Sequence, residues 1–181
     1  MTEPQTYDVV LLVEQPLSAQ DARQVRSLHE GIEGPVRYHV VLPVEDAAAR
    51  VESAMGSLAA SEVLASPTIM LSDVNLEEVQ QEILEHARDD VSACVDRMAD
   101  AGGNALGTIV NLDPIDAVAA KAKEVDAAEV IILTRPHVVA EFFHMDWSSR
   151  ARRKLGVPVL HLLEHESFDE QAGGGEGSTG M

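Results

Sequence analysis

Short runs of branched apolar residues alternate along the chain with segments whose apolar residues recur every three or four positions. The runs at residues 9–13, 36–42, 106–112, 130–133 and 157–163 predict strands. Continuous apolar runs are typical of strands buried on both faces of a parallel sheet, and helical spacing between them predicts crossover helices. The pattern therefore predicts an α/β protein with an open, mostly parallel sheet that carries helices on both faces.

The first predicted helix follows the first strand. Ser18 and Asp21 have the spacing of a capping box, in which each side chain accepts a backbone N–H of the other residue. We expect this helix to end at Gly31 or Gly34, because glycine terminates helices at low conformational cost. Its predicted buried face consists of Ala22, Val25, Leu28 and Ile32.

A longer helix is expected from the cap residue Asn75 to Gly102. Its apolar stripe comprises Leu76, Val79, Ile83, Ala87, Val91, Val95 and Met98. Cys94 lies one position off this stripe, and we expect it to be an inert packing residue. A further helix begins at Asp113-Pro114, where an N-cap acceptor precedes proline at the first helical position. Residues 46–65 are predicted helical, and residues 68–71 form either a short strand or an anchored loop.

Composition narrows the class of protein. The 31 acidic and 13 basic residues give a formal net charge of −18, which disfavours binding to nucleic acid or to anionic membranes. We predict one domain at residues 6–166 and a flexible glycine-rich tail at residues 167–181. With one cysteine, no signal-peptide pattern and no apolar run of about 20 residues, the sequence suggests a cytoplasmic protein.

The chemistry most unlike the rest of the chain lies at residues 135–154. This segment carries five basic residues, two acidic residues and three of the six aromatic residues. One interpretation is an anion site, in which Arg135, Ser148, Ser149 and Arg150 hold a phosphate or a carboxylate. The other is a loop anchored by its aromatic rings, whose arginines form a solvated face that pairs with surplus acidic residues.

Other catalytic patterns are weak. The sequence contains no Gly-x-Ser-x-Gly elbow, Gly-x-Gly-x-x-Gly fingerprint or P-loop, so we predict no catalytic residues and no enzyme, with weak ATP hydrolysis left open. His137, His144 and Asp146 have suitable side chains for a metal, but nothing in their spacing favours one, and we predict no metal site.

Several segments together resemble the universal stress protein family over about residues 7–163. They are Val13-Glu14, residues 39–41, residues 113–115 with 128–132, and the closing residues 156–160. The resemblance implies a five-stranded α/β sheet of the adenine nucleotide alpha hydrolase-like type. It also implies a cytoplasmic, stress-related protein that forms a homodimer through its C-terminal strand.

Some members of that family bind ATP, and the resemblance transfers two contacts to this chain. Glu14 stands where an acidic residue ends the first strand, and Val40 stands where a small apolar residue contacts adenine. The family's phosphate loop reads Gly-x2-Gly-x9-Gly-Ser/Thr, whereas this chain has no glycine between Gly107 and Gly156. Without glycine the backbone loses its close approach to phosphate, so the usual cradle is expected to be absent.

Two functions follow as expectations. The first is a non-enzymatic, dimeric, stress-related or regulatory protein that lacks the ATP-binding glycine loop and has no resident cofactor. The alternative is a module that binds a nucleotide, ATP or AMP among them, or another small phosphorylated ligand, through the cationic segment after the fourth strand.

Overall fold

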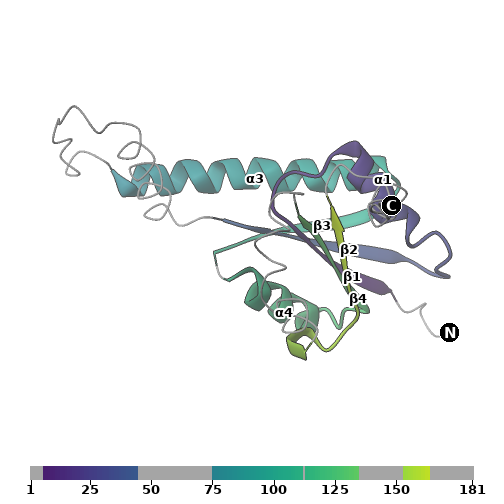
Figure 1. Ribbon diagram of the computed structural model, residues 1–181. Helices are drawn as coiled ribbons and strands as arrows, with labels where there is room; N and C mark the ends of the chain where they lie inside the picture. The colour runs from purple at the N-terminus through teal and green to yellow at the C-terminus, as the bar shows by residue number, and fades with distance from the viewer. Residues whose placement is uncertain (1–5, 45–74, 112, 135–152, 164–181) are drawn as a thin grey trace, which may run out of the picture.

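The computed structural model describes residues 6–44, 75–111, 113–134 and 153–163. Within them, five strands and three helices follow one another along the chain (Figure 1). The elements are β1 (Tyr7–Val13), α1 (Ala19–Ser27), β2 (Val36–Pro43), α3 (Leu76–Asp100), β3 (Asn104–Val110), α4 (Pro114–Glu124), β4 (Glu129–Thr134) and β5 (Val159–Leu163). The alternation of strands and helices predicted from the sequence is confirmed, with strand ends shifted by one or two residues.

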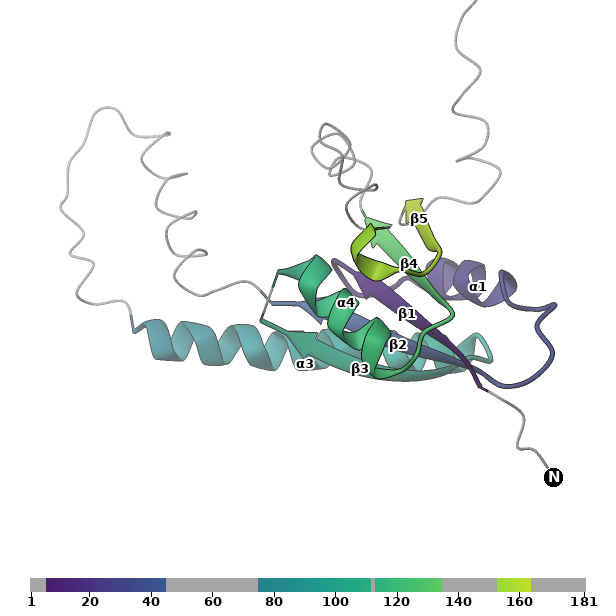
Figure 2. The same ribbon diagram turned by 90° about the horizontal axis from the view of Figure 1, so that it is seen from below.

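The strands form one sheet in the order β3-β2-β1-β4-β5, and every neighbouring pair is parallel. Helices α1 and α3 lie on one face, and α4 covers the other (Figures 1 and 2). Because β2 lies on one side of β1 and β4 on the other, the direction of winding reverses between β1 and β4. The predicted doubly covered α/β fold is confirmed, and the described sheet is entirely parallel.

Apolar side chains fill both layers beside the sheet. Alternate residues of β1 point to opposite faces, so Leu11 packs toward α1 and α3 whereas Leu12 packs toward α4. Residues Val130–Leu133 of β4 are each at most 1% exposed. Burial on both faces explains why these strands read as unbroken apolar runs.

The helix caps follow the predicted chemistry. The Ser18 hydroxyl accepts from the Asp21 N–H at 3.1 Å, and the Asp21 carboxylate accepts from the Ser18 N–H at 2.8 Å, which completes the capping box. Helix α1 nevertheless ends at Ser27, short of both predicted glycines. Residues 28–31 form turns instead, and Leu28 still packs against the core.

Helix α3 departs from the predicted stripe at two positions. Leu76 is 48% exposed at the first turn, whereas Cys94 is fully buried and accepts a hydrogen bond from the Leu17 N–H at 3.3 Å. The buried face is therefore rotated toward Cys94, which is confirmed as a packing residue. Gly107 on β3 allows this close packing, because a Cβ there would lie 2.6 Å from Val91 Cγ2.

Several predictions fall outside the described residues. They include the helix at 46–65, residues 68–71, most of the cationic segment and the proposed tail; the domain boundary stays a prediction. No helix in the described part of the chain combines the length and apolarity needed to cross a membrane.

Candidate functional site

Two small pockets open at the carboxyl end of the sheet. The first, of about 150 Å³, lies toward α4, and the second, of about 130 Å³, lies toward α3. The first is lined by Leu12, Glu14, Pro43, Asp113, Pro114, Ile115, Ile132 and Thr134. The second is lined by Glu14, Leu42, Pro43, Val44, Ile83, His86, Ala87 and Asp90. Each has about the volume of a cavity that holds one small ring.

Glu14 and Pro43 line both pockets, so the two pockets adjoin. Glu14 follows the last residue of β1, directly beside the strand pair where the winding reverses. In open α/β sheets, ligands bind at this reversal, outside the carboxyl ends of the strands. The position of Glu14 is therefore the expected position of a ligand-contacting side chain.

The amino end of α4 borders the first pocket and has its backbone donors occupied. Asp113 Oδ1 accepts from the N–H groups of Ile115 at 3.0 Å and Asp116 at 3.2 Å. The Asp113 carbonyl accepts from the Ala117 N–H at 2.9 Å, and Pro114 has no N–H. A helix start of this kind offers a ligand a carboxylate instead of the amide donors that usually attract anions.

Thr134 lines the first pocket at the end of β4 and lies beside His161 of β5. Thr134 ends β4 and is 5% exposed, and its hydroxyl oxygen lies 2.7 Å from His161 Nε2. Burial lowers the pKa of His161, because desolvation disfavours the charged imidazolium. The histidine is therefore neutral at neutral pH, and the Thr134 hydroxyl has a fixed partner.

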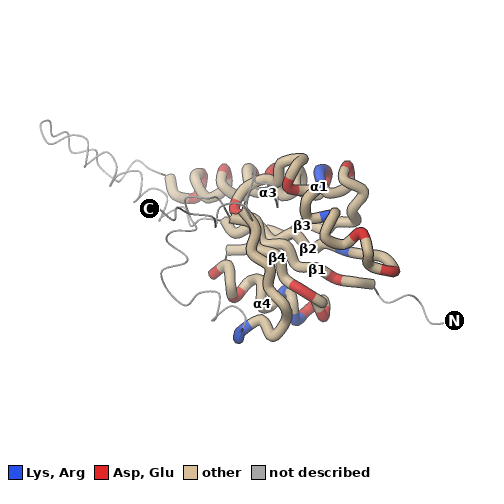
Figure 3. Tube along the Cα trace, turned by 45° about the vertical axis from the view of Figure 1, so that its right-hand side comes forward, with Lys and Arg blue, Asp and Glu red and all other residues tan. Residues whose placement is uncertain are grey.

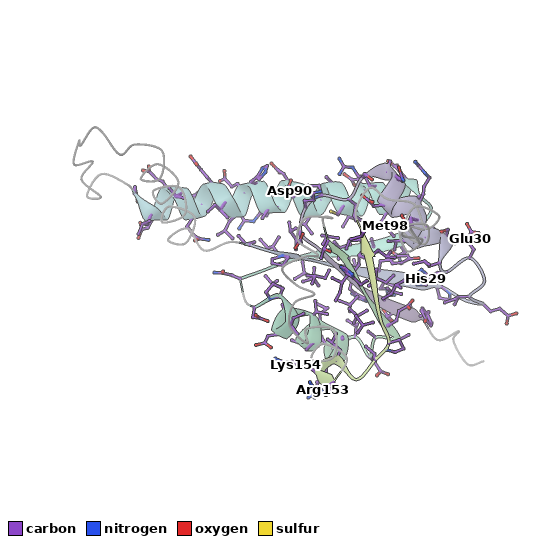
Figure 4. The ribbon with its side chains drawn as sticks, viewed as in Figure 1. His29, Glu30, Asp90, Met98, Arg153 and Lys154 are labelled. Atoms are coloured by element: carbon purple, nitrogen blue, oxygen red, sulfur yellow. The ribbon has the colours of Figure 1, made fainter. Side chains whose placement is uncertain are left out.

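The second pocket combines an apolar wall with two polar side chains of α3. His86 and Asp90 are one helical turn apart, with His86 Nε2 3.6 Å from Asp90 Oδ2, and Figure 4 labels Asp90 on this helix. Ile83 and Ala87 supply the apolar surface. Across the described residues, no group of three or more His, Cys, Asp and Glu side chains is arranged to hold a metal ion.

Charge is distributed unevenly around the sheet. Acidic residues are spaced along α3, whereas Arg153 and Lys154 lie near α4 (Figures 3 and 4). Lys154 pairs with Asp116 in the first turn of α4. At Lys154, one of the two described positions of residues 135–154, the basic side chain pairs with a surplus acid, as the second interpretation of that segment expected.

At the amino end of the sheet, a different polar cluster is buried between α1 and the strands. His29 is 3% exposed, and its Nε2 lies 2.5 Å from Glu129 Oε1 (Figure 4 labels His29). His29 Nδ1 lies 2.9 Å from both the Val25 carbonyl oxygen and the Tyr38 hydroxyl. Burial raises the pKa of Tyr38 to about 12. We call His29, Tyr38 and Glu129 the amino-end cluster.

The structure places two of the six predicted ligand residues. Glu14 lines both pockets, and its contact with a ligand stays a prediction. Val40 is fully buried in the core three residues before the end of β2 and lines neither pocket, whereas Pro43 lines both pockets and Leu42 lines the second. The other four candidates lie outside the described residues. They are Arg135, Ser148, Ser149 and Arg150.

Four polar residues of the pocket linings were not predicted as ligand contacts. Asp113 was predicted only as a helix cap, and Thr134 lies one residue beyond the strand predicted at residues 130–133. His86 and Asp90 lie on a helix face with alternating acidic and basic residues, which resembles a solvated surface. Only the strand order, which brings these elements to the carboxyl end of the sheet, distinguishes these four residues from ordinary surface residues.

Solved structures with this arrangement include universal stress proteins, although no protein-family model and no curated protein matches the sequence. The hypothetical protein MJ0577 is 12% identical, with a TM-score of 0.59 over 88% of this chain and 97% of that one. A universal stress protein family protein from Arabidopsis thaliana, solved with AMP bound, is 13% identical, with a TM-score of 0.52 over 88% of this chain and 92% of that one. A member of the family from Burkholderia pseudomallei is 17% identical, with a TM-score of 0.50 over 86% of this chain and 96% of that one. This chain therefore has the fold of the universal stress protein family, as its resemblance implied.

Proposed function

We propose that this protein is a non-enzymatic regulatory protein of the universal stress protein type that binds a small ligand of nucleoside or nucleotide size. The observation that carries the proposal is the pair of adjoining pockets that meet at Glu14, where the winding of the sheet reverses. Two ring-sized pockets side by side suit a ligand with two rings, such as a base and its sugar. A stress-related role in the cytoplasm, inferred from the family resemblance and the single cysteine, belongs to the same proposal.

The chemistry of the pockets supports binding more than catalysis. In the described part of the site, Glu14 and Asp113 are the acidic side chains of the first pocket, and Asp113 is engaged in capping α4. Two prolines and three aliphatic residues make up most of the remaining lining. The AMP bound to the Arabidopsis thaliana protein of the same fold supports a nucleotide-like ligand here.

Calorimetric titration of the full chain with adenosine, AMP and ATP tests the proposal. We expect at least one of the three to bind, with a thermal stabilisation of about 2.7 kcal/mol at 100 times its dissociation constant. Turnover of ATP should stay at background. Failure of all three to bind at millimolar concentration would remove this class of ligand.

A second mode of ligand binding is possible at residues 135–154. In this mode a phosphate group would be held by Arg135, Ser148, Ser149 and Arg150. An Arg135→Ala variant separates this route from the pockets. If phosphate binding drives affinity, the variant should bind AMP about tenfold more weakly, the size of a lost charge-assisted hydrogen bond. Equal affinities for AMP in the variant and the native chain would exclude a role of Arg135 in phosphate binding.

Dimerisation through β5 is the remaining part of the proposal. β5 is an edge strand of the described sheet, and Val159 and Leu160 are only partly buried. Exposed edges with apolar residues favour pairing with another chain. Sedimentation at micromolar concentration should give a dimer, and a Leu160→Lys variant should shift the distribution to monomer. A native chain that sediments only as monomer would refute this arrangement.

A further inference from the structure

The loop that joins β1 to α1 lies along helix α3. Glu14, the first residue after β1, lines the second pocket together with Asp90 of α3. Leu17, three residues later, is bonded to Cys94 and Arg97, which lie one and two turns further along the same helix. The distance from Asp90 to Arg97 along a helix is about 10 Å. The same helix therefore forms a wall of the pocket and supports the loop that carries Glu14.

Helix α3 binds both backbone groups of Leu17. The Leu17 N–H donates to Cys94 Sγ at 3.3 Å, and Arg97 Nη1 donates to the Leu17 carbonyl oxygen. Leu17 is 1% exposed, and a buried backbone group that loses its partner is costly. Cys94 and Arg97 are three positions apart, so their side chains leave the same face of α3. The two side chains thus act together on one residue of the loop.

The rest of the loop has little freedom once Leu17 is held. Ser18 and Asp21 form the capping box that fixes the residue after Leu17. The ring of Pro16 restricts the backbone on the other side of Leu17. The Leu17 side chain packs into the core layer that α1 and α3 share. With β1 fixed at one end and Leu17 at the other, few backbone conformations remain for Glu14.

We propose that Cys94 and Arg97 are positioning residues, which hold Leu17 and thereby order Glu14 at the two pockets. Order in the loop and binding at Glu14 are then coupled through α3. A ligand that contacts Glu14 strengthens the contacts at Leu17, and a chain without those contacts has to order the loop when the ligand binds. The inference rests on the proposed function, because it states how the carboxylate between the pockets is held in place.

Nuclear magnetic resonance relaxation of the full chain without ligand tests the role of Arg97. We expect a backbone order parameter of about 0.85 at Glu14 in the native chain and below about 0.6 in Arg97→Met, which keeps the aliphatic stem and removes the donors. Arg97→Lys retains a charged donor and should keep Glu14 near its native value. Arg88→Met, the same change at an exposed position of α3, is the matched control and should leave Glu14 unchanged.

Hydrogen exchange at the Leu17 amide tests the role of the thiol. Cys94→Ala removes the acceptor and should accelerate this exchange about tenfold more than exchange in β1. Met98→Ala is the control for lost packing, because Met98 is a fully buried residue of the same helix (Figure 4). It should accelerate exchange at Leu17 and in β1 to similar extents. Cys94→Ser retains an acceptor and should give a rate between those of Cys94→Ala and the native chain.

Calorimetry with adenosine then tests the coupling. Arg97→Met should bind adenosine about fivefold more weakly than the native chain, whereas Arg88→Met should stay within about twofold. A Glu14 that stays ordered in Arg97→Met would overturn the inference, whether or not a ligand binds. Loss of order at Glu14 with unchanged affinity would overturn the coupling and leave the proposed function in place. A native chain that binds none of adenosine, AMP and ATP would overturn both the coupling and the proposed function.

Discussion

The two ends of the sheet differ in how they use polar side chains. At the amino end, His29, Tyr38 and Glu129 bind one another and the Val25 carbonyl beneath α1, within a buried layer. At the carboxyl end, Glu14 lies between two pockets whose walls include Pro43 and Pro114. One end packs its polar groups into a buried layer, whereas the other has open pockets beside its polar groups.

The connections of a parallel sheet explain why the open end is the carboxyl end. β1 leads into α1 on one face of the sheet and β3 leads into α4 on the other, and the two pockets lie at the carboxyl end beside β1, where the strand order reverses. At the amino end, His29 lies in the connection after α1 and is buried against Tyr38 of β2 and Glu129 of β4. The comparison predicts that substitutions at the amino end change stability and that substitutions at the carboxyl end change binding.

The largest expected effect is at His29. His29→Ala removes the partner of both Glu129 and Tyr38 and leaves a cavity, so the free energy of unfolding should fall by about 2–4 kcal/mol. Adenosine affinity in the folded fraction should be unchanged. Urea denaturation measures the loss, and His86→Ala is the matched control, because the His86 side chain is 76% exposed and should cost less than about 0.5 kcal/mol. Equal costs for the two variants would contradict a stabilising amino-end cluster.

The next effect concerns the two tyrosines of the chain, Tyr38, which belongs to the amino-end cluster, and Tyr7, whose ring lies beside His29. Burial raises the pKa of Tyr38 to about 12, and burial together with the Glu129 carboxylate raises the pKa of Tyr7. The unfolded chain loses these phenol protons near pH 10, so stability should fall as the pH rises from about 10 toward 12. Ultraviolet titration of the folded protein should show little phenolate at about pH 10, and early ionisation of both residues would refute this packing.

A smaller effect is expected at Glu14. Glu14→Gln keeps the shape of the side chain but removes its charge, so adenosine binding should weaken about tenfold through loss of a charge-assisted hydrogen bond. The free energy of unfolding should change by less than about 0.5 kcal/mol, because Glu14 is only partly buried. Calorimetry and urea denaturation of the same preparation measure both quantities. A variant that loses stability but not affinity would reverse the roles assigned to the two ends.

The smallest effect is the acid response of His161. Burial lowers the pKa of His161 in the folded protein. Below about pH 6.5 the unfolded chain therefore takes up a proton that the folded chain does not, and the free energy of unfolding falls as the pH falls. His161→Leu removes this contribution. The native chain should therefore lose more stability than the variant between about pH 7.5 and about pH 5.5. Parallel losses would show that His161 is not buried in solution.

The strands and helix starts were predictable because their causes are local. Apolar runs, the Ser18 capping box and the Asp113-Pro114 start follow from neighbouring residues, and each is confirmed. The burial of individual helix residues was harder to predict from the sequence. Cys94 faces the core because α1 and the segment before it pack on that side of α3.

One of the residues that line the pockets, Glu14, was among the residues predicted to contact a ligand. Glu14 follows a recognisable strand, whereas Thr134 and His161 meet only through the pairing of β4 with β5 across 27 residues. Val40 was predicted to contact a ligand but is buried in the core. The continuous apolar run of β2 does not show which of its residues borders a pocket. Such contacts depend on the order and register of strands, which a single sequence does not fix.

Hydrogen exchange measured with and without adenosine tests the comparison between the two ends most directly. The account predicts slower exchange at the ends of β1, β2 and β4 and in the first turn of α4 when adenosine is bound. It predicts no change around His29 and the beginning of β4. Protection concentrated at the amino end, or unchanged exchange at the carboxyl end under saturating adenosine, would contradict the assignment of the pockets as the binding site.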